Sequence, residues 1–194
     1  NANKLEDFAP LLVEKLNALS NLDDKLRFAI EYVQNNINYI YNAYEMNGHK
    51  PQEPIKTFEN KQGDCKAKSV LLKVILDYIG VESSVILVNF NTDVYLEYYL
   101  PSLLTFNHVI VKIKYKDEVY FVDATIRDEF GYIENRNVLY FKHFLEILPN
   151  QELQKRASEK IKPRASTLDK SDTTNAPNNR LSPQFNSIIN SPLT

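Results

Sequence analysis

The amino-acid sequence predicts an α+β domain in which a central helix packs on an antiparallel β-sheet. Helical periodicity dominates residues 5–80, and three strand-like runs follow between residues 81 and 125. The second and third of these runs are separated by only two residues, Lys116 and Asp117. Helices followed by successive strands with short turns are typical of α+β folds with an antiparallel sheet.

Two amphipathic patterns occupy the first 37 residues. Apolar side chains recur at steps of three and four in the first pattern, at Leu5, Phe8, Leu12, Leu16 and Leu19. Pro10 marks either the start of this helix or a kink in it. The second pattern follows Ser20 or Asn21 as the N-cap and comprises Leu22, Leu26, Ile30, Val33 and Ile37.

Residues 42–62 contain Gly48, Pro51 and Pro54 among many polar side chains, which predicts a loop. A third helix is expected to begin at Cys65 and to stop at Gly80, a residue that readily adopts the left-handed conformation. Its inner face carries the apolar side chains Leu72, Leu76 and Ile79.

Three strands are expected at residues 81–90, 108–115 and 118–125. The first contains the continuous apolar run 85–88, which suits a strand covered on both faces. Between the first two strands, residues 92–105 form a Tyr- and Leu-rich excursion that predicts a lid or a wall.

The end of the chain carries weaker signals. A hairpin or irregular strand pair is expected directly after residue 125, and a short helix at residues 144–153. Ser, Thr, Asn and Pro dominate from residue 155 onward, which indicates a linker or tail leading to adjoining domains. We therefore divide the chain into a helical part with its loop (1–62), a core (63–150) and a polar tail (151–194).

Composition narrows the classes of protein. The 194 residues are 43% hydrophobic and 25% charged, which fits one soluble domain with a sizeable core. A net charge of −2 argues against a nucleic-acid partner, and no apolar run approaches the roughly 18 residues that a membrane span needs. One cysteine excludes an internal disulfide and a thiolate metal cluster, and His49 and His143 stand apart from metal-ligand partners.

Cys65 occupies a position suited to a reactive thiol. Asp64 is a good N-cap, which places Cys65 at the first helical position. Unpaired N–H groups and the positive end of the helix dipole favour a thiolate there, and Lys66 and Lys68 add positive potential. The structural alternative is a buried cysteine that starts a core helix beside solvated lysines.

His108 and Asp123 are expected to meet. If Lys116 and Asp117 form a two-residue turn, paired positions sum to 233, so Ile110 faces Asp123 and His108 faces Thr125. His108 and Asp123 then lie on one face in diagonal positions, within reach of a hydrogen bond. A three-residue loop would place them on opposite faces. The structural alternatives are a histidine without a chemical role and an aspartate that caps the turn into Thr125.

These three residue types form the parts of a Cys-His-Asp acyl-transfer site. The cysteine attacks a carbonyl carbon, the histidine takes and returns the proton, and the aspartate orients the imidazole and stabilises its charged form. The sequence therefore predicts Cys65, His108 and Asp123 as catalytic residues.

The segments QGDCKAKSVLLKVILDYIGV, LPSLLTFNHVIVKI, YFVDAT and FGYI resemble the bacterial transglutaminase-like proteins, in particular a subgroup often fused behind an N-terminal β-rich domain of unknown function. The resemblance covers residues 22–148 and implies a papain-like fold. It also implies that Cys65 is the nucleophile, His108 the general base and acid, and Asp123 the orienting carboxylate. A periplasmic or exported location is compatible with it. One departure is Ala67, where the subgroup usually has an acid.

A few groups are candidate hydrogen-bond donors for the oxyanion hole. The backbone N–H of Cys65 is the first donor, and the second is the side chain of Gln62, Tyr39 or Tyr41. Loop packing is the structural alternative for each of these side chains. Asn107 points to the face opposite His108 in a regular strand, which favours a structural role.

The expected function is a cysteine-dependent amide-bond hydrolase or acyl transferase that acts on a protein or peptide without a cofactor. The alternative is a non-catalytic module on the same fold that binds a peptide or glycan through residues 95–99 and 100–104. A third option is acyl transfer from a small thioester donor, as in the arylamine acetyltransferases, although the sequence shows no cofactor-binding loop.

Overall fold

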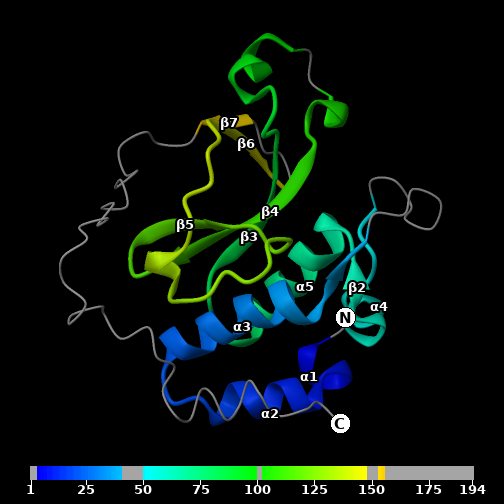
Figure 1. The fold of residues 1–194 in the computed structure, drawn as a ribbon, viewed down its shortest axis with the longest axis vertical. Helices are drawn as coiled ribbons and strands as arrows, with labels where there is room; N and C mark the ends of the chain where they lie inside the picture. The colour runs from blue at the N-terminus through cyan, green and yellow to red at the C-terminus, as the bar shows by residue number, and fades with distance from the viewer. Residues whose placement is uncertain (1–3, 41–49, 100–101, 148–152, 156–194) are drawn as a thin grey trace, which may run out of the picture.

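The computed structural model describes residues 4–40, 50–99, 102–147 and 153–155. In this part of the chain, helices pack against a curled antiparallel sheet, which confirms the mixed α/β class and the antiparallel sheet expected from the sequence (Figure 1). The helices are α1 (Leu5–Phe8), α2 (Pro10–Ala18), α3 (Leu22–Asn36), α4 (Pro54–Asn60) and α5 (Cys65–Tyr78). Among the helices, α5 packs directly on the sheet, and α3 packs against α5.

The sheet has the strand order β5-β4-β3-β6-β7, with antiparallel neighbours throughout. Its strands are β3 (Ser83–Val88), β4 (His108–Tyr115), β5 (Glu118–Val122), β6 (His143–Glu146) and β7 (Leu153–Lys155). A small parallel pair, β1 (Asn38–Tyr39) and β2 (Gln62–Gly63), joins the end of α3 to the start of α5. As expected for the central strand, β3 is largely covered on both faces.

The helix boundaries follow from local chemistry. Asn21 is the N-cap of α3, because its side chain accepts a hydrogen bond from the Asp24 N–H at 2.8 Å. Pro10 begins α2 at its first turn, after the short helix α1. Gly80 has φ +76° just beyond α5, so this glycine ends the helix as predicted.

The turn between β4 and β5 has two residues, as the sequence predicted. Lys116 and Asp117 both have positive φ, 50° and 61°, which is the conformation of a tight hairpin turn with the right-handed twist of its strands. Tyr115 pairs with Glu118, and the register holds as far as Val111 opposite Val122. The paired positions therefore sum to 233.

Two apolar clusters use alternate side chains of the sheet. The larger joins the helices to one face and contains Val111 and Ile113 of β4. The smaller lies on the other face and comprises Ile86, Val88, Ile110, Phe141 and Phe144. The N-terminal helices share the larger cluster with α5 and the sheet, so the described parts of residues 1–62 and 63–150 pack around one core.

Three expectations from the sequence were wrong. The predicted loop 42–62 contains α4, which begins at Pro54, and strand β2. The segment after residue 125 forms turns and a short 3₁₀ helix, Ile133–Asn135, instead of a hairpin. Residues 143–146 form strand β6 beside β3, where a helix at 144–153 was expected.

The predicted tail falls mostly outside the described residues, apart from Leu153–Lys155, which form an edge strand beside β6. His49 also lies outside them. Among the described helices, none has the length and apolar character needed to cross a membrane.

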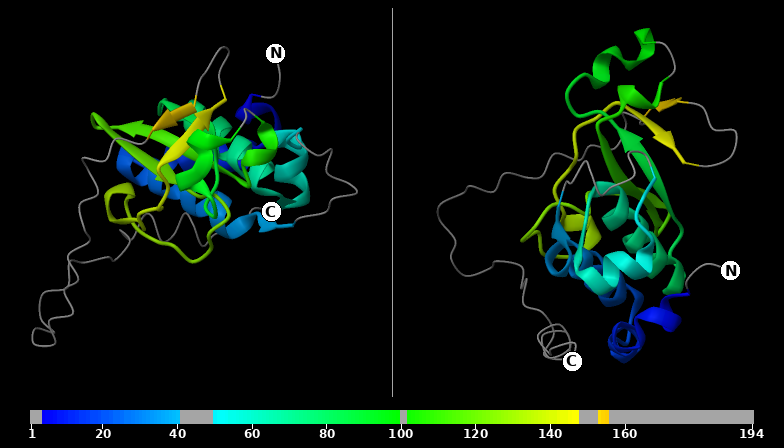
Figure 2. Two further views of the ribbon diagram at one scale, coloured as in Figure 1. Left: turned by 90° about the horizontal axis from the view of Figure 1, so that it is seen from above. Right: turned by 90° about the vertical axis from the view of Figure 1, so that its right-hand side faces the viewer.

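The excursion between β3 and β4 projects from the end of the sheet, away from the helical half of the molecule (Figures 1 and 2). Its described part includes two 3₁₀ helices, Asp93–Tyr98 and Leu103–Thr105. Tyr95, Tyr98 and Tyr99 on this segment are exposed. The excursion therefore presents its aromatic side chains to solvent.

Candidate active site

Cys65 is the first residue of α5, directly after its N-cap. The Asp64 carboxylate accepts a hydrogen bond from the Ala67 N–H at 2.9 Å and forms an ion pair with Lys66. Asp64 is buried, whereas Cys65 is partly exposed. The cap predicted from the sequence thus holds the only thiol of the chain at a helix N-terminus, where solvent reaches it.

His108 begins β4, and Asp123 follows the last residue of β5. The His108 Nε2 and Asp123 Oδ2 atoms are 2.8 Å apart, so the expected hydrogen bond between them is present. The side chain of Cys65 adjoins the His108 ring, and its interaction raises the pKa of the imidazole. Because Nε2 is engaged by Asp123, Nδ1 is the ring nitrogen that is left to face the sulfur.

Asp123 also caps the turn that follows it. Its Oδ1 atom accepts hydrogen bonds from the N–H and the hydroxyl of Thr125 at 2.8 and 2.7 Å. The turn-capping role and the contact with His108 therefore coexist, one on each carboxylate oxygen. The two bonds from Thr125 fix the plane of the carboxylate, and that plane orients the imidazole.

Electrostatics favour a protonated His108. Burial opposes the imidazolium, but hydrogen bonds and charge interactions with Asp123 and Cys65 outweigh it and raise the pKa of His108 to about 9. Burial likewise opposes the charged form of Asp123, yet the bonds from His108 and Thr125 lower its pKa. Because the folded pKa of His108 lies above its ordinary 6.5, its proton stabilises the fold fully below pH 6.5, and this contribution disappears as the pH rises through about 9.

Replacing Asp123 with asparagine is expected to lower the pKa of His108 by about one to two units, because the opposite charge beside the imidazolium is lost. An NMR titration of the imidazole protons measures this shift directly. Asp93→Asn is the matched control, because Asp93 contacts the other described histidine, His143, at 3.3 Å. An unchanged His108 titration in Asp123→Asn would contradict the assignment.

The two lysines after Cys65 lie in different surroundings. Lys66 pairs with Asp64, whereas Lys68 is fully buried and its Nζ atom donates hydrogen bonds to the backbone oxygens of Gln34 and Ile37. The sequence-based picture of solvated lysines is therefore wrong for Lys68. Its charge lies at the C-terminal end of α3, where a helix dipole is negative.

Gly63 allows close packing at the start of α5. A Cβ atom there would lie 2.7 Å from the Ala67 Cβ and 3.1 Å from the Thr57 Cγ2, and both of those residues are fully buried. The small residue at position 67, where the resembling subgroup has an acid, is thus part of a tight contact. This contact brings β2 against the first turn of the helix.

Gly63→Ala is expected to lower the free energy of unfolding by about 1–3 kcal/mol, because overpacking forces the backbone to move. Urea denaturation measures the loss. Gly80→Ala serves as a comparison in which a Cβ meets nothing within 4 Å and only the positive φ is strained. A Gly63→Ala protein as stable as the wild type would show that the contact relaxes freely.

The residues considered for the oxyanion hole are only partly located. The β1–β2 pairing sets Tyr39 opposite Gly63, two residues before Cys65, and the side chains of Tyr39 and Gln62 are exposed. Their backbones therefore lie beside the helix start. Tyr41 lies outside the described residues, and the assignment of a second oxyanion donor stays a prediction.

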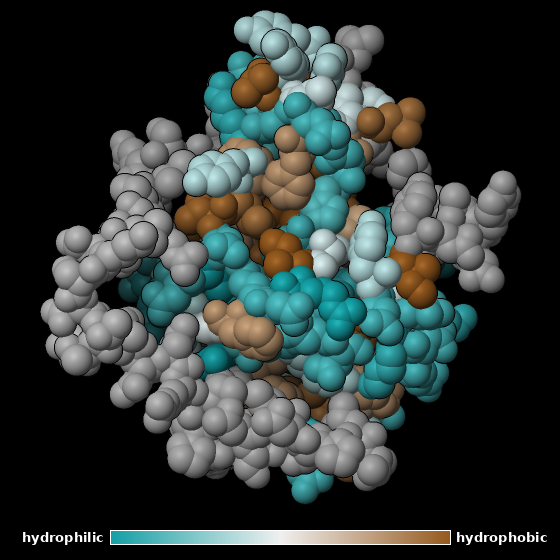
Figure 3. Space-filling view, viewed as in Figure 1, coloured by the Kyte–Doolittle hydropathy of each residue, from teal (hydrophilic) through white to brown (hydrophobic). Residues whose placement is uncertain are grey.

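Sequence reasoning missed an aromatic neighbour of His108. The Phe90 and His108 rings have centroids 5.4 Å apart, and Phe90 also packs edge-on against Phe141 at 6.2 Å. Phe90 is 38% exposed. On the face shown in Figure 3, hydrophobic side chains gather below the projecting excursion. The sequence around Phe90 gave no sign that its ring would lie beside His108.

The base of the excursion is fastened by two asparagines. Asn89 hydrogen-bonds to Thr92 and to the Thr105 backbone oxygen, so it holds both ends of the excursion. Asn107 accepts a bond from the Phe90 N–H at 3.2 Å and donates to Asn89 at 3.2 Å. These contacts agree with the structural role expected for Asn107 and fix the loop that carries Phe90.

His143 fastens the excursion to the sheet. It is fully buried in β6, and its Nε2 atom lies 2.8 Å from the Glu97 Oε1. The His143 N–H donates to the Asp93 Oδ1 at 2.8 Å. With Asn89 at the base, these contacts tie the first half of the excursion to the sheet, and the choice between a lid and a wall stays a prediction.

No protein-family model and no curated protein matches the chain. Among solved structures it is similar to a crystal structure described as a "putative protease" from Parabacteroides distasonis, with 14% identity and a TM-score of 0.58 over 77% of this chain. It is also similar to a "putative cysteine protease" from Cytophaga hutchinsonii, with 15% identity and a TM-score of 0.47 over 64% of this chain. The chain spans 28% and 40% of the lengths of those proteins. At this identity, the first likeness shows only that the chain shares its fold with part of a larger protein.

Proposed function

We propose that the protein is a cysteine-dependent amide hydrolase or acyl transferase of transglutaminase-like, papain-like type, acting on a protein or peptide through Cys65, His108 and Asp123. The observation that carries the proposal is the position of the His108 imidazole, which lies beside Cys65 and has its Nε2 atom 2.8 Å from the Asp123 Oδ2 atom. The fold shared with part of a crystal structure described as a "putative protease" supports the same class of reaction.

The proposed reaction begins with the Cys65 sulfur, ionised by transfer of its proton to His108. The sulfur attacks the carbonyl carbon of an amide and forms a C–S bond. The C–N bond then breaks, and the leaving amine takes a proton from the His108 imidazolium. A thioester on Cys65 remains.

Water or a second amine resolves the thioester. His108 takes a proton from this nucleophile as it attacks the thioester carbon, and the C–S bond breaks to restore the sulfur anion. Asp123 keeps its negative charge throughout and stabilises the charged imidazole. The Cys65 N–H lies at the start of α5, where unpaired N–H groups point outward, and it is the proposed first donor to the oxyanion.

The experiment that tests the proposal is trapping of the thioester. We expect the wild-type protein, incubated with a panel of peptide amides including glutaminyl peptides, to gain an acyl mass on Cys65 and to release hydroxamate when hydroxylamine is added. Cys65→Ala should form neither product. Amide turnover that survives in Cys65→Ala would exclude the proposed nucleophile.

A peptide- or glycan-binding module without catalysis is the second candidate. The observation that favours it is the exposure of the aromatic side chains of the excursion, with Tyr98 at 81% and Tyr95 at 58%. Such a module needs no contact between the sulfur and the imidazole. A Cys65→Ala protein that binds peptide or glycan as tightly as the wild type, with no adduct formed by either, would favour this candidate.

A further inference from the structure

Gln34 contacts both halves of the candidate site. This residue lies near the end of α3 and is fully buried. Its side-chain Nε2 donates a hydrogen bond to the backbone oxygen of Asp123 at 2.9 Å. Its own backbone oxygen accepts a bond from the Lys68 Nζ at 3.3 Å. Lys68 belongs to the helix that begins at Cys65 and lies about one turn after it.

The link from Lys68 to α3 is strengthened by a second acceptor. The Lys68 Nζ also donates to the Ile37 backbone oxygen at 2.5 Å. The last carbonyls of a helix have no partner within the helix, and a cation there is favourable. The end of α3 is therefore tied to the first turn of α5.

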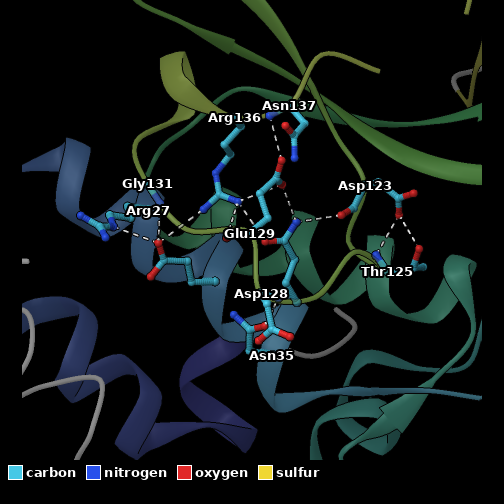
Figure 4. Close-up of polar contacts among 11 residues, drawn as sticks. Arg27, Asn35, Asp123, Thr125, Asp128, Glu129, Gly131, Arg136 and Asn137 are labelled. Atoms are coloured by element: carbon cyan, nitrogen blue, oxygen red, sulfur yellow. Dashed lines mark hydrogen bonds and ion pairs between the residues drawn. The ribbon is translucent and has the colours of Figure 1, made fainter. Parts of the chain in front are cut away.

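The link from Gln34 to Asp123 is held by a buried ionic cluster, drawn in Figure 4. Arg136 Nη1 donates to the Gln34 Oε1 at 2.9 Å, and the Gln34 Nε2 also donates to the Glu129 Oε2 at 3.1 Å. Arg136 pairs with Glu129 at 3.2 Å. The Gln34 Oε1 accepts from arginine, and its Nε2 donates to two oxygens. These partners fit only one of the two orientations of the Gln34 amide.

The buried pair of Arg136 and Glu129 is a poor way to gain folding stability. The Arg136 and Glu129 side chains are only 4% and 9% exposed, and the Arg136 Nε and Nη2 atoms make no hydrogen bond within the described residues. Moving two charges out of water costs desolvation free energy, and the attraction between the charges does not always exceed this cost. Replacing a buried ion pair with apolar side chains of similar volume is often neutral or stabilising. The contact of this cluster with Gln34 therefore points to a role besides stability.

We propose that Gln34 is a positioning residue that fixes Asp123 relative to Cys65, through its side chain to the Asp123 backbone and through Lys68 to the helix that carries the nucleophile. The inference rests on the proposed function and deepens it, because it adds a fourth residue to the three that perform the reaction. Gln34 acts through Asp123 and needs no contact with substrate.

The test is an NMR titration of His108 in Gln34→Met, a replacement of similar length that can neither donate nor accept these hydrogen bonds. If Gln34 positions Asp123, the carboxylate moves relative to the imidazole, and the pKa of His108 falls from about 9 by about one unit or more. The groups that set this pKa from neighbouring elements are Asp123 and Cys65. The readout needs no substrate.

Glu31→Gln is the matched control. Glu31 is also buried in the same cluster and accepts hydrogen bonds from Arg27 and the Gly131 N–H at 2.9 Å, neither of which leads to Asp123. It should lower the melting temperature and leave the His108 titration near 9. If Gln34→Met also lowers only the melting temperature, the positioning role is excluded.

If Gln34→Met does not fold, Gln34→Asn replaces it, since asparagine keeps a neutral amide near Arg136 but is one methylene too short to reach the Asp123 backbone oxygen. The same fall in the pKa of His108 is expected, and an unchanged pKa overturns the proposal. Failure of the proposed function looks different, because no thioester would form on Cys65 even where the His108 titration responds to Gln34 as described.

Discussion

Replacing His108 with alanine is expected to lower kcat/KM for amide substrates by about 10³–10⁶-fold, the loss seen when the histidine of a nucleophile–histidine pair is removed. Among the described residues, His108 is the base that adjoins Cys65 and contacts Asp123, so it is the group placed to take the proton from the sulfur. Hydroxamate release from a responsive peptide, followed over a range of substrate concentrations, measures the loss.

The control for this experiment is His143→Gln. His143 is also buried and also contacts carboxylates, Asp93 and Glu97, but it fastens the excursion and does not adjoin Cys65 in the recorded contacts. This variant should lose stability and keep kcat within about tenfold of the wild type. Equal losses in the two variants would mean that His108 has only a structural role.

Replacing Arg136 with methionine should lower the free energy of unfolding by about 3–5 kcal/mol, because it leaves the buried Glu129 carboxylate without its cation. Arg136 also lies 3.6 Å from Glu31 and donates to Gln34, so three partners lose a contact at once. Equilibrium unfolding in urea measures the change. Lys73→Met, which breaks the exposed pair with Asp77, is the comparison and should change stability by less than about 1 kcal/mol.

A double-mutant cycle isolates the charge pair. The combination of Arg136→Met with Glu129→Leu should be less destabilising than the sum of the two single replacements, by about 1–3 kcal/mol, because the double variant retains neither buried charge. Strict additivity would mean that the two side chains do not interact through the ion pair.

The parts of the fold that sequence predicted well depend on short-range chemistry. The Asp64 cap, the stop at Gly80 and the two-residue turn at Lys116 and Asp117 are set by neighbouring residues, and that turn fixes which side chains share a face. Because His108 begins one of the strands joined by this turn and Asp123 directly follows the other, the register extended by one or two residues predicts their hydrogen bond.

Two of the three wrong expectations have clear physical causes. Pro54 was taken as a sign of a loop, although proline is favoured in the first turn of a helix, where α4 places it. The run at residues 143–146 is too short for its apolar pattern to separate helix from strand, and its pairing with β3 joins residues about sixty positions apart.

The residues that support the site, Lys68 and Gln34, differ in how far the sequence indicated their positions. Lys68 lies four residues before Leu72 on the inner face of α5, so its spacing already indicated a buried lysine. Gln34 gave no such signal, because its partners Asp123 and Arg136 are 89 and 102 positions away. Only the tertiary structure brings them together.

The most direct test of the account is the rate at which iodoacetamide alkylates Cys65 at pH 6. If His108 takes the Cys65 proton as proposed, alkylation is expected to be at least about tenfold faster in the folded protein than in the same chain in denaturant, and His108→Ala should remove this advantage. Equal rates in the folded and unfolded chains, or an advantage that persists in His108→Ala, would contradict the central claim.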